Sequence, residues 1–213
     1  YIDYKDFIDD PENNPLGTES GKFQIHSQGL ADTIEAYGWD TIAPIAQYKY
    51  VLEGFEETFQ DFEAGVKGEY PLQLTTIHYP RRSHSTLDNV SVLREAFQNR
   101  LYMHPSDAKE RGITKDDLVK VTSRHGTVIR PVYLTERIVP GTLTLGQGAW
   151  AEIDEKTGYC LAGATNVLNG GNPTGQGVQA YNSCNVQVEK YVGTLKPDYL
   201  WEKRIVSAQK GGN

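Results

Sequence analysis

The segment that decides the expected fold is Leu72-Gln73-Leu74-Thr75-Thr76-Ile77-His78-Tyr79, followed closely by Arg82-Ser83-His84-Ser85-Thr86-Leu87-Asp88-Asn89. The first part is largely apolar and rich in β-branched residues, which predicts a strand. A helix is expected after the second part, over residues 90–97. The loop between them therefore gathers a guanidinium, an imidazole, hydroxyls and an amide at one point, where they can bind a polar ligand.

Short strands are predicted along most of the chain after residue 70. They are expected near Leu72–Ile77, Arg100–His104, Leu118–Ser123, Val128–Thr135, Thr142–Leu145 and Asn185–Lys190. A brief helix is predicted after the second strand, with Ser106 as its N-cap and Gly112 just past its end. Gly126 is expected to form a hairpin turn between two strands. Many short strands with brief helices predict a small barrel or sandwich.

Residues 1–69 give weaker signals. Residues 21–27 alternate like a short strand. Further along is an acidic run without Lys or Arg, made of Glu53, Glu56, Glu57, Asp61 and Glu63. Apolar residues recur beside it at helical spacing, namely Leu52, Phe55, Phe59 and Phe62. This pattern predicts an amphipathic helix with a solvated acidic face.

Composition narrows the classes of function. The net charge of −7 argues against a general nucleic-acid binder, which would carry a basic face. No apolar run reaches the length of a membrane span, and no export signal opens the chain. The chain begins at Tyr1 and not at Met, so we expect a fragment or a processed product. The two cysteines, Cys160 and Cys184, form no C-x-x-C motif, which argues against an iron–sulfur or zinc site and leaves a disulfide between them open.

Residues 149–183 are rich in Gly, Asn and Thr and poor in aliphatic residues. A loop of this length in a compact domain either binds something or is disordered. Asn166 and Asn169 carry groups that both donate and accept, which suits a heterocyclic ligand. Gly146-Gln147-Gly148 is only half of a dinucleotide-binding fingerprint, so it predicts no nucleotide cradle.

Seven segments, taken together and in order, resemble the C-terminal domain of the dimethyl sulfoxide reductase family of molybdopterin oxidoreductases, with the closest likeness to its anaerobic dimethyl sulfoxide reductases. They are Leu16-Gly17-Thr18-Glu19-Ser20-Gly21-Lys22, Arg82-x-His84-Ser85-Thr86-x-x-Asn89, His104-Pro105-x-Asp107-Ala108-x-x-x-Gly112-Ile113, Pro140-Gly141, Gly146-x-Gly148-Ala149-Trp150, Asn166-Val167-Leu168 and Val186-Gln187-Val188-Glu189-Lys190. The chain departs from the family where many relatives have a Thr-Asn pair and it has Ser183-Cys184.

The resemblance implies a fold and an organisation. The fold is mainly β with short helices, a six-stranded double-psi β-barrel over residues 70–192. An irregular N-terminal extension, residues 1–69, would pack on the barrel or on preceding domains absent from this chain. Residues 193–213 would form a C-terminal tail.

The resemblance also implies a cofactor. In this family the last domain closes over bis(molybdopterin guanine dinucleotide) carrying Mo or W, which the preceding domains mainly hold. The residues that would line its pterin side are Arg82, His84, Ser85, Thr86, Asn89, Gln147, Trp150, Asn166 and Asn169. The guanidinium fork of Arg82 suits a phosphate or a pterin carbonyl. The ring of Trp150 can stack on a flat ring or wall off the site.

Catalysis and partners follow from the same resemblance. The metal ligand and the cysteines of an iron–sulfur cluster belong to earlier parts of the family's polypeptide, so no catalytic or metal-binding residue is predicted here and the isolated chain should be inactive. The expected reaction is oxygen-atom transfer from an S-oxide or N-oxide in anaerobic respiration. Expected partners are the preceding domains, an iron–sulfur electron-transfer subunit and a membrane anchor subunit, on the periplasmic side.

Alternatives remain open at this stage. Other branches of the superfamily, of formate dehydrogenase, nitrate reductase or formylmethanofuran dehydrogenase type, would share this domain. Double-psi barrels also serve as non-redox binding or adaptor modules. At the level of single residues, His84 could merely cap a backbone carbonyl, Trp150 could be core packing, and both cysteines could be inert thiols.

Overall fold

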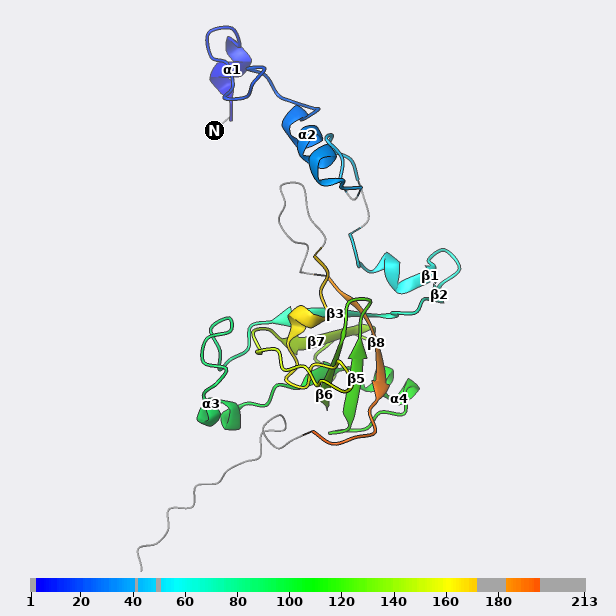
Figure 1. Cartoon of the computed structure of the whole chain (residues 1–213). Helices are drawn as coiled ribbons and strands as arrows, with labels where there is room; N and C mark the ends of the chain where they lie inside the picture. Colours follow the sequence, from blue (N-terminus) through cyan, green and yellow to red (C-terminus); the bar gives the residue numbers. More distant parts are fainter. Residues whose placement is uncertain (1–2, 41, 49–50, 172–182, 196–213) are drawn as a thin grey trace, which may run out of the picture. The chain divides into compact units, whose positions relative to one another are not determined.

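The computed structural model describes residues 3–40, 42–48, 51–171 and 183–195 (Figure 1). They fall into two compact units. One contains residues 3–40 and 42–48, and the other contains residues 51–171 and 183–195. Most of the predicted C-terminal tail, residues 196–213, and part of the Asn-rich loop, residues 172–182, lie outside the described residues. Within the described residues, no helix is both long enough and apolar enough to cross a membrane.

The described part of the first unit contains two helices, α1 (Lys5–Asp9) and α2 (Gln28–Tyr37). Ser27 caps α2, because its hydroxyl accepts a hydrogen bond from the Leu30 N–H at 3.4 Å. The predicted strand over residues 21–27 is therefore wrong. A single isolated bridge joins His26 to Ile45, and alternation without a neighbouring strand cannot build a ladder.

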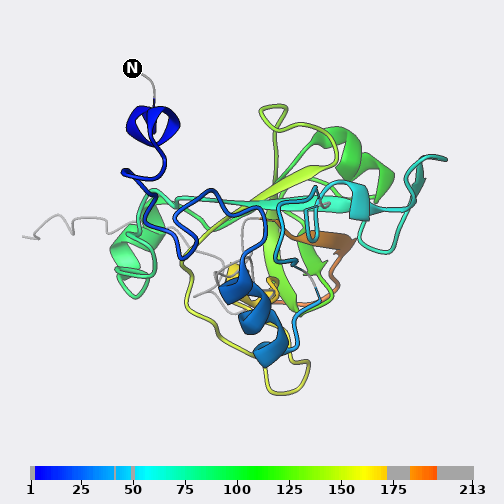
Figure 2. The same cartoon turned by 90° about the horizontal axis from the view of Figure 1, so that it is seen from above.

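The second unit is built on a closed barrel in the order β3-β7-β4-β6-β5-β8, whose strands curl around a common interior in both views (Figures 1 and 2). The strands are β3 (Leu72–Ile77), β4 (Leu101–Met103), β5 (Leu118–Thr122), β6 (Thr127–Leu134), β7 (Thr142–Gly146) and β8 (Asn185–Lys190). β3 pairs with β7 and β4 pairs with β6 in parallel, while the other neighbours are antiparallel. All six predicted strands and the six-stranded barrel are confirmed.

In β5 and other strands the barrel interior is filled by the inward-facing half of an alternation, whereas residues 127–132 of β6 are all buried. In β5, for example, Val119 and Val121 are fully buried while Leu118, Lys120 and Thr122 are partly exposed. The other strands contribute Leu101, Met103, Val132, Leu143, Leu145 and Val186, all with no exposed surface. Burying one such side chain typically contributes about 1.5–3 kcal/mol, so this period-two pattern holds the strands in register.

Short helices connect the strands. They are α3 (Ser91–Ala96), α4 (Pro105–Glu110) and the 3₁₀ turn η2 (Thr165–Val167). His104, and not Ser106 as predicted, caps α4: the Nδ1 atom of His104 accepts from the Ser106 N–H at 3.2 Å. Pro105 explains the shift, since proline favours the first helical position. Gly112 is left-handed just past the helix, as predicted.

The helix predicted along the acidic run is also wrong. Residues 56–67 form a 3₁₀ turn, η1 (Glu56–Thr58), and a hairpin of β1 (Phe59–Asp61) and β2 (Val66–Lys67). The phenylalanines that gave the helical spacing instead pack edge-on around this hairpin, at ring distances of 5.2–6.1 Å. Glu53, assigned to a solvated face, is buried with 2% of its surface exposed.

Candidate functional site

The polar loop after β3 is a tight turn with strained backbone. Ser83 and Thr86 exchange both backbone hydrogen bonds, at 2.9 and 3.3 Å. His84 and Leu87 adopt left-handed conformations, with φ of 51° and 73°. Such strain persists only where the surroundings hold the backbone, and it clusters at ligand sites. The turn exposes the predicted site residues His84, Ser85, Thr86 and Asn89 to solvent.

A second predicted loop, residues 146–150, lies directly against the first. A Cβ added to Gly148 would come within 1.7 Å of the His84 carbonyl oxygen, and Gly148 has a φ of +87°, so only glycine fits. Trp150 donates its Nε1–H to the Ser85 carbonyl at 2.8 Å, while about half of its surface is exposed. Gln147 is anchored through its N–H to the Ile77 carbonyl at 2.9 Å. The loops carrying R-x-H-S and G-A-W thus form one surface.

Asp88 lies beneath this surface and joins its parts. It is 4% exposed. Its Oδ1 accepts from Arg82 Nη1 at 2.6 Å, and its Oδ2 accepts from the Trp150 N–H at 2.9 Å. Arg94 of α3 pairs with the same carboxylate, with Nη2 3.5 Å from Oδ2. Asp88 was absent from the predicted site, although as the one acid of the quoted loop it was a visible signal.

The Arg82 side chain is buried, whereas its motif predicts an exposed donor. Only 3% of its side chain is exposed. The guanidinium lies 3.9 Å from the centre of the Tyr79 ring, and burial raises the pKa of Tyr79 to about 12. The Nε and Nη2 groups of Arg82 are buried and, among the described residues, have no hydrogen-bond partner. A buried donor without an acceptor is costly, so these two donors are positions for an acceptor that the described residues do not supply.

Arg130 was missed by the sequence prediction. It lies in β6, is 1% exposed, and donates from Nε to the Asn99 carbonyl at 2.7 Å and from Nη1 to the Leu161 carbonyl at 3.1 Å. A Cβ on Gly163 would come within 2.4 Å of the Arg130 side chain. Burial lowers the pKa of Arg130 to about 10. One arginine inside a mainly apolar strand was the available signal.

The remaining predicted residues, Asn166 and Asn169, lie on or just after η2. Asn166 is exposed and Asn169 is half-buried. This segment packs on the β5–β6 turn, since a Cβ on Gly126 would meet the Val167 carbonyl at 2.6 Å. No hydrogen bond between described residues links either asparagine to residues 82–89. The structure therefore brings the first seven predicted residues together and leaves these two on a neighbouring segment.

A second buried carboxylate, Glu53, lies near that turn. Its Oε1 accepts from His125 Nε2 at 2.5 Å and lies 3.6 Å from Arg124 Nε. Its Oε2 is buried and, in the described part of the chain, has no hydrogen-bond partner. Cys184 donates to the Leu168 carbonyl at 3.1 Å, and burial together with the Glu53 charge raises its pKa to about 12. Cys160 and Cys184 are both free thiols.

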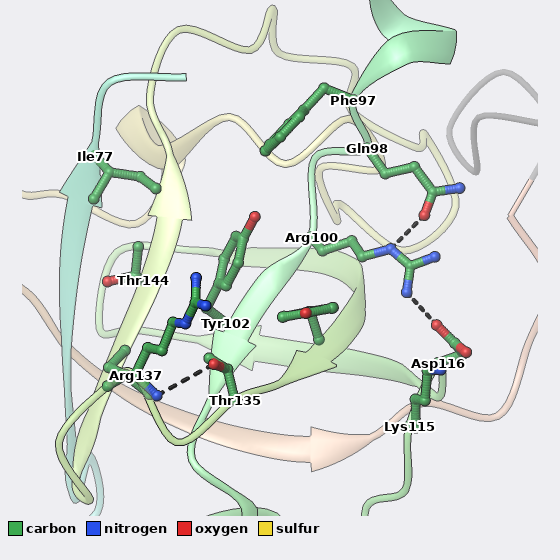
Figure 3. Close-up of a pocket in the computed structure, with 12 residues that line it drawn as sticks. Ile77, Phe97, Gln98, Arg100, Tyr102, Lys115, Asp116, Thr135, Arg137 and Thr144 are labelled. Atoms are coloured by element: carbon green, nitrogen blue, oxygen red, sulfur yellow. Dashed lines mark hydrogen bonds and ion pairs between the residues drawn. The ribbon is translucent and has the colours of Figure 1, made fainter. Parts of the chain in front are cut away.

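A groove of about 790 Å³ opens on the outer face of β3, β7, β4 and β6. Figure 3 shows Ile77, Thr144 and Tyr102 across its floor, Phe97 at one end, and Arg100 bound to Gln98 and Asp116 at its edge. Its size falls within the range of ligand pockets. None of the nine predicted cofactor residues is among the residues that line it.

Comparison with known proteins identifies the family. The family model described as "Molydopterin dinucleotide binding domain" matches residues 72–185, more than half of the chain. The chain belongs to this family. Two curated relatives are "Dimethyl sulfoxide reductase DmsA" of Escherichia coli K12, 40% identical over 89% of this chain, and "Trimethylamine-N-oxide reductase" of Haemophilus influenzae, 34% identical over 91%. The chain spans 23% of the length of each.

A solved structure supports the fold. Acetylene hydratase from Pelobacter acetylenicus matches with a TM-score of 0.59 at 20% identity, over 85% of this chain and 25% of that one. At this identity the likeness concerns the fold alone. Together with the family match, it confirms that the barrel is the molybdopterin dinucleotide-binding type, as the sequence motifs predicted.

The residues of the two-loop surface fit such a dinucleotide. Its pterin and phosphate oxygens and ring nitrogens need several donors and acceptors, and here the loop that carries the unmet Arg82 donors also carries exposed hydroxyl, imidazole and amide groups. The close approach at Gly148 leaves no room for a side chain at that position. Among the described residues, no group of three His, Cys, Asp or Glu side chains could hold a metal ion.

Proposed function

We propose that this chain is the C-terminal, cofactor-closing domain of an oxidoreductase that contains bis(molybdopterin guanine dinucleotide) with Mo or W. The proposed reaction is reduction of an S-oxide or N-oxide by oxygen-atom transfer. The observation that carries the proposal is the joined surface of the two loops above the unmet donors of Arg82. The names of the two relatives, a dimethyl sulfoxide reductase and a trimethylamine-N-oxide reductase, supply the substrate class.

The role of this chain is binding and exclusion of water. His84, Ser85, Thr86 and Asn89 would donate to and accept from the pterin edge, and Arg82 would support them from below. The exposed ring of Trp150 would cover a flat face of the cofactor. The cofactor, when bound, supplies the two-electron chemistry. Gln147, Asn166 and Asn169 are proposed to complete the contact.

The proposal includes parts outside this chain. Preceding domains of the same polypeptide would hold most of the cofactor and supply the metal ligand and an iron–sulfur cluster. An electron-transfer subunit with iron–sulfur clusters and a membrane anchor subunit would complete a respiratory complex on the periplasmic side. The chain's acidic balance supports no role for nucleic acid.

The test uses the full-length protein. Molybdenum or tungsten, pterin and iron are measured in the purified protein, and reduction of dimethyl sulfoxide and trimethylamine-N-oxide is followed with a reduced viologen dye. We expect pterin and metal together with reduction of at least one oxide, and no turnover by the 213-residue chain alone. A folded protein without pterin would favour the adaptor-module alternative.

Substrate assays separate the other branches of the superfamily. Formate oxidation or nitrate reduction, in a protein loaded with pterin and inactive on both oxides, would overturn the substrate class and retain the cofactor. The variant Arg82→Ala with His84→Ala tests the surface itself. We expect it to lose cofactor, whereas Lys120→Ala with Glu189→Ala, which removes an exposed ion pair on β5 and β8, should keep it.

A further inference from the structure

Asp88 is a buried carboxylate that connects three separate segments of the candidate surface. It binds Arg82 of its own loop, the backbone N–H of Trp150 in the other loop, and Arg94 of α3. Both carboxylate oxygens are taken by these protein donors. Asp88 is therefore not available to bind a ligand itself, but it fixes the groups that are.

The contact gives Arg82 a single orientation. Nη1 is held by Asp88 at 2.6 Å, and the guanidinium lies over the ring of Tyr79. Because a guanidinium is planar and rigid, fixing it at one nitrogen and one face also fixes Nε and Nη2. These are the two donors without a partner among the described residues.

The same carboxylate sets the position of the second loop. Trp150 is tied to Asp88 through its backbone N–H and to Ser85 through its indole N–H. The two bonds place the exposed ring against residues 82–89, so the loops cannot shift independently. Groups that hold binding residues in place in this way commonly matter nearly as much as the binding residues.

We propose that Asp88 is a positioning residue for the molybdopterin dinucleotide, which holds Arg82 and Trp150 so that residues 82–89 and 146–150 bind the cofactor as one surface. The inference rests on the proposed function. It assigns to Asp88 no contact with the cofactor and no part in the reaction.

The test is Asp88→Asn in the full-length enzyme. Asparagine keeps the shape and one acceptor for the Trp150 N–H, but it removes the charge that faces Arg82. The readout is the rate at which pterin leaves the protein after dilution, followed by the fluorescence of the released, oxidised pterin. We expect release to be about tenfold faster, as is typical for loss of a partner that orients a binding group. Asp88→Glu, which restores the charge, should recover part of the difference.

The matched control is Asp117→Asn. Asp117 also accepts several hydrogen bonds, from the Thr114 N–H at 2.7 Å and from Lys190 at 2.9 Å, but its partners belong to neither loop. We expect this variant to lower the melting temperature and to release pterin at the wild-type rate. If both variants released pterin in proportion to their loss of thermal stability, Asp88 would be merely structural and the inference would be overturned.

A double variant tests the route through Arg82. If Asp88 acts on the cofactor by orienting Arg82, Asp88→Asn with Arg82→Gln releases pterin no faster than Arg82→Gln alone. Additive acceleration would overturn that route. If the Asp88→Asn protein does not accumulate, the double variant serves as the test in its place, because it leaves no unpaired charge between these two residues. Release of pterin from the double variant at the wild-type rate would then overturn the inference.

The pterin content of the wild-type enzyme distinguishes failure of this inference from failure of the proposed function on which it rests. A wild-type enzyme without pterin overturns both. A wild-type enzyme that holds pterin, with Asp88→Asn releasing it at the same rate, overturns only the role of Asp88.

Discussion

Two of the buried carboxylates, Asp88 and Glu53, differ in what their surroundings lack. Around Asp88 both carboxylate oxygens are bound, and the unmet groups are donors, Nε and Nη2 of Arg82. Around Glu53 the unmet group is an acceptor, its own Oε2. The first site is short of acceptors and the second is short of donors. A ligand rich in oxygen acceptors therefore suits the Asp88 site and not the Glu53 site.

The partners of the two carboxylates differ in a second way. Asp88 is held by guanidinium groups from two segments and by a backbone N–H from a third. Glu53 is held by the adjacent Arg124 and His125 of one turn, and 49% of the Arg124 side chain is exposed. Asp88 therefore joins three separate segments, whereas Glu53 attaches one segment to one hairpin turn.

The largest effect is expected for Asp88→Ala in the 213-residue chain. Removing one partner of a buried ion pair leaves the other charge uncompensated and typically costs about 3–5 kcal/mol. Arg82 and Arg94 would both lose their acid. Urea unfolding followed by circular dichroism measures the loss. A loss below about 1 kcal/mol is the size expected for an exposed pair. It would show that the Asp88 ion pair contributes no more than an exposed one.

Sequence predicted the barrel well because each strand carries its own evidence. Val119 and Val121 alternate with partly exposed neighbours, and this local pattern needs no knowledge of the partner strand. The segment around Glu53 shows the limit. Its position depends on Ser183 donating to the Leu52 carbonyl at 2.6 Å and on Asn185 donating to the Gly54 carbonyl at 2.9 Å, across 131 residues. Local aromatic spacing could not reveal those bonds, and it gave a helix.

The candidate site shows the same limit of prediction from local sequence. The motifs found the two loops, because each loop is continuous in sequence. They did not find Asp88, whose bond to the Trp150 N–H spans 62 residues, or Arg130, whose acceptors lie 31 residues away on either side. The roles of the exposed residues toward a cofactor stay predictions, whereas the contact between the loops is a property of the fold.

A smaller effect is expected for Glu53→Gln. The amide carbonyl can still accept from His125 Nε2, so the main hydrogen bond survives, while the amide N–H₂ enters a site that lacks a partner. Since a single hydrogen bond contributes a net of about 0.5–1.5 kcal/mol, the expected loss in unfolding free energy is about 1 kcal/mol. Glu189→Gln, at an exposed pair with Lys120, is the control and should change less. A loss as large as that of Asp88→Ala would show that Glu53 is equally central.

The last prediction concerns Cys184, whose thiol is buried beside Glu53, and the few-fold effect that Glu53→Gln should have on its alkylation. Burial first, and the Glu53 charge second, raise its pKa from 9.0 to about 12. The pKa is higher in the folded protein than in the unfolded chain. The contribution of the protonated thiol to stability is therefore fully present below about pH 9 and is lost as the pH rises toward about 12. At about pH 9 an alkylating reagent should therefore modify Cys184 at least a hundredfold more slowly in the folded protein than in the unfolded chain, since the thiolate is the nucleophile. Mass spectrometry of the Cys184 peptide measures the alkylation rate separately from that of Cys160.

Glu53→Gln removes the lesser of the two causes of the raised Cys184 pKa, so it should speed alkylation by only a few fold. A much larger acceleration would mean that the carboxylate, and not burial, keeps the thiol protonated, and the Glu53 site would then be governed by charge in the way the Asp88 site is.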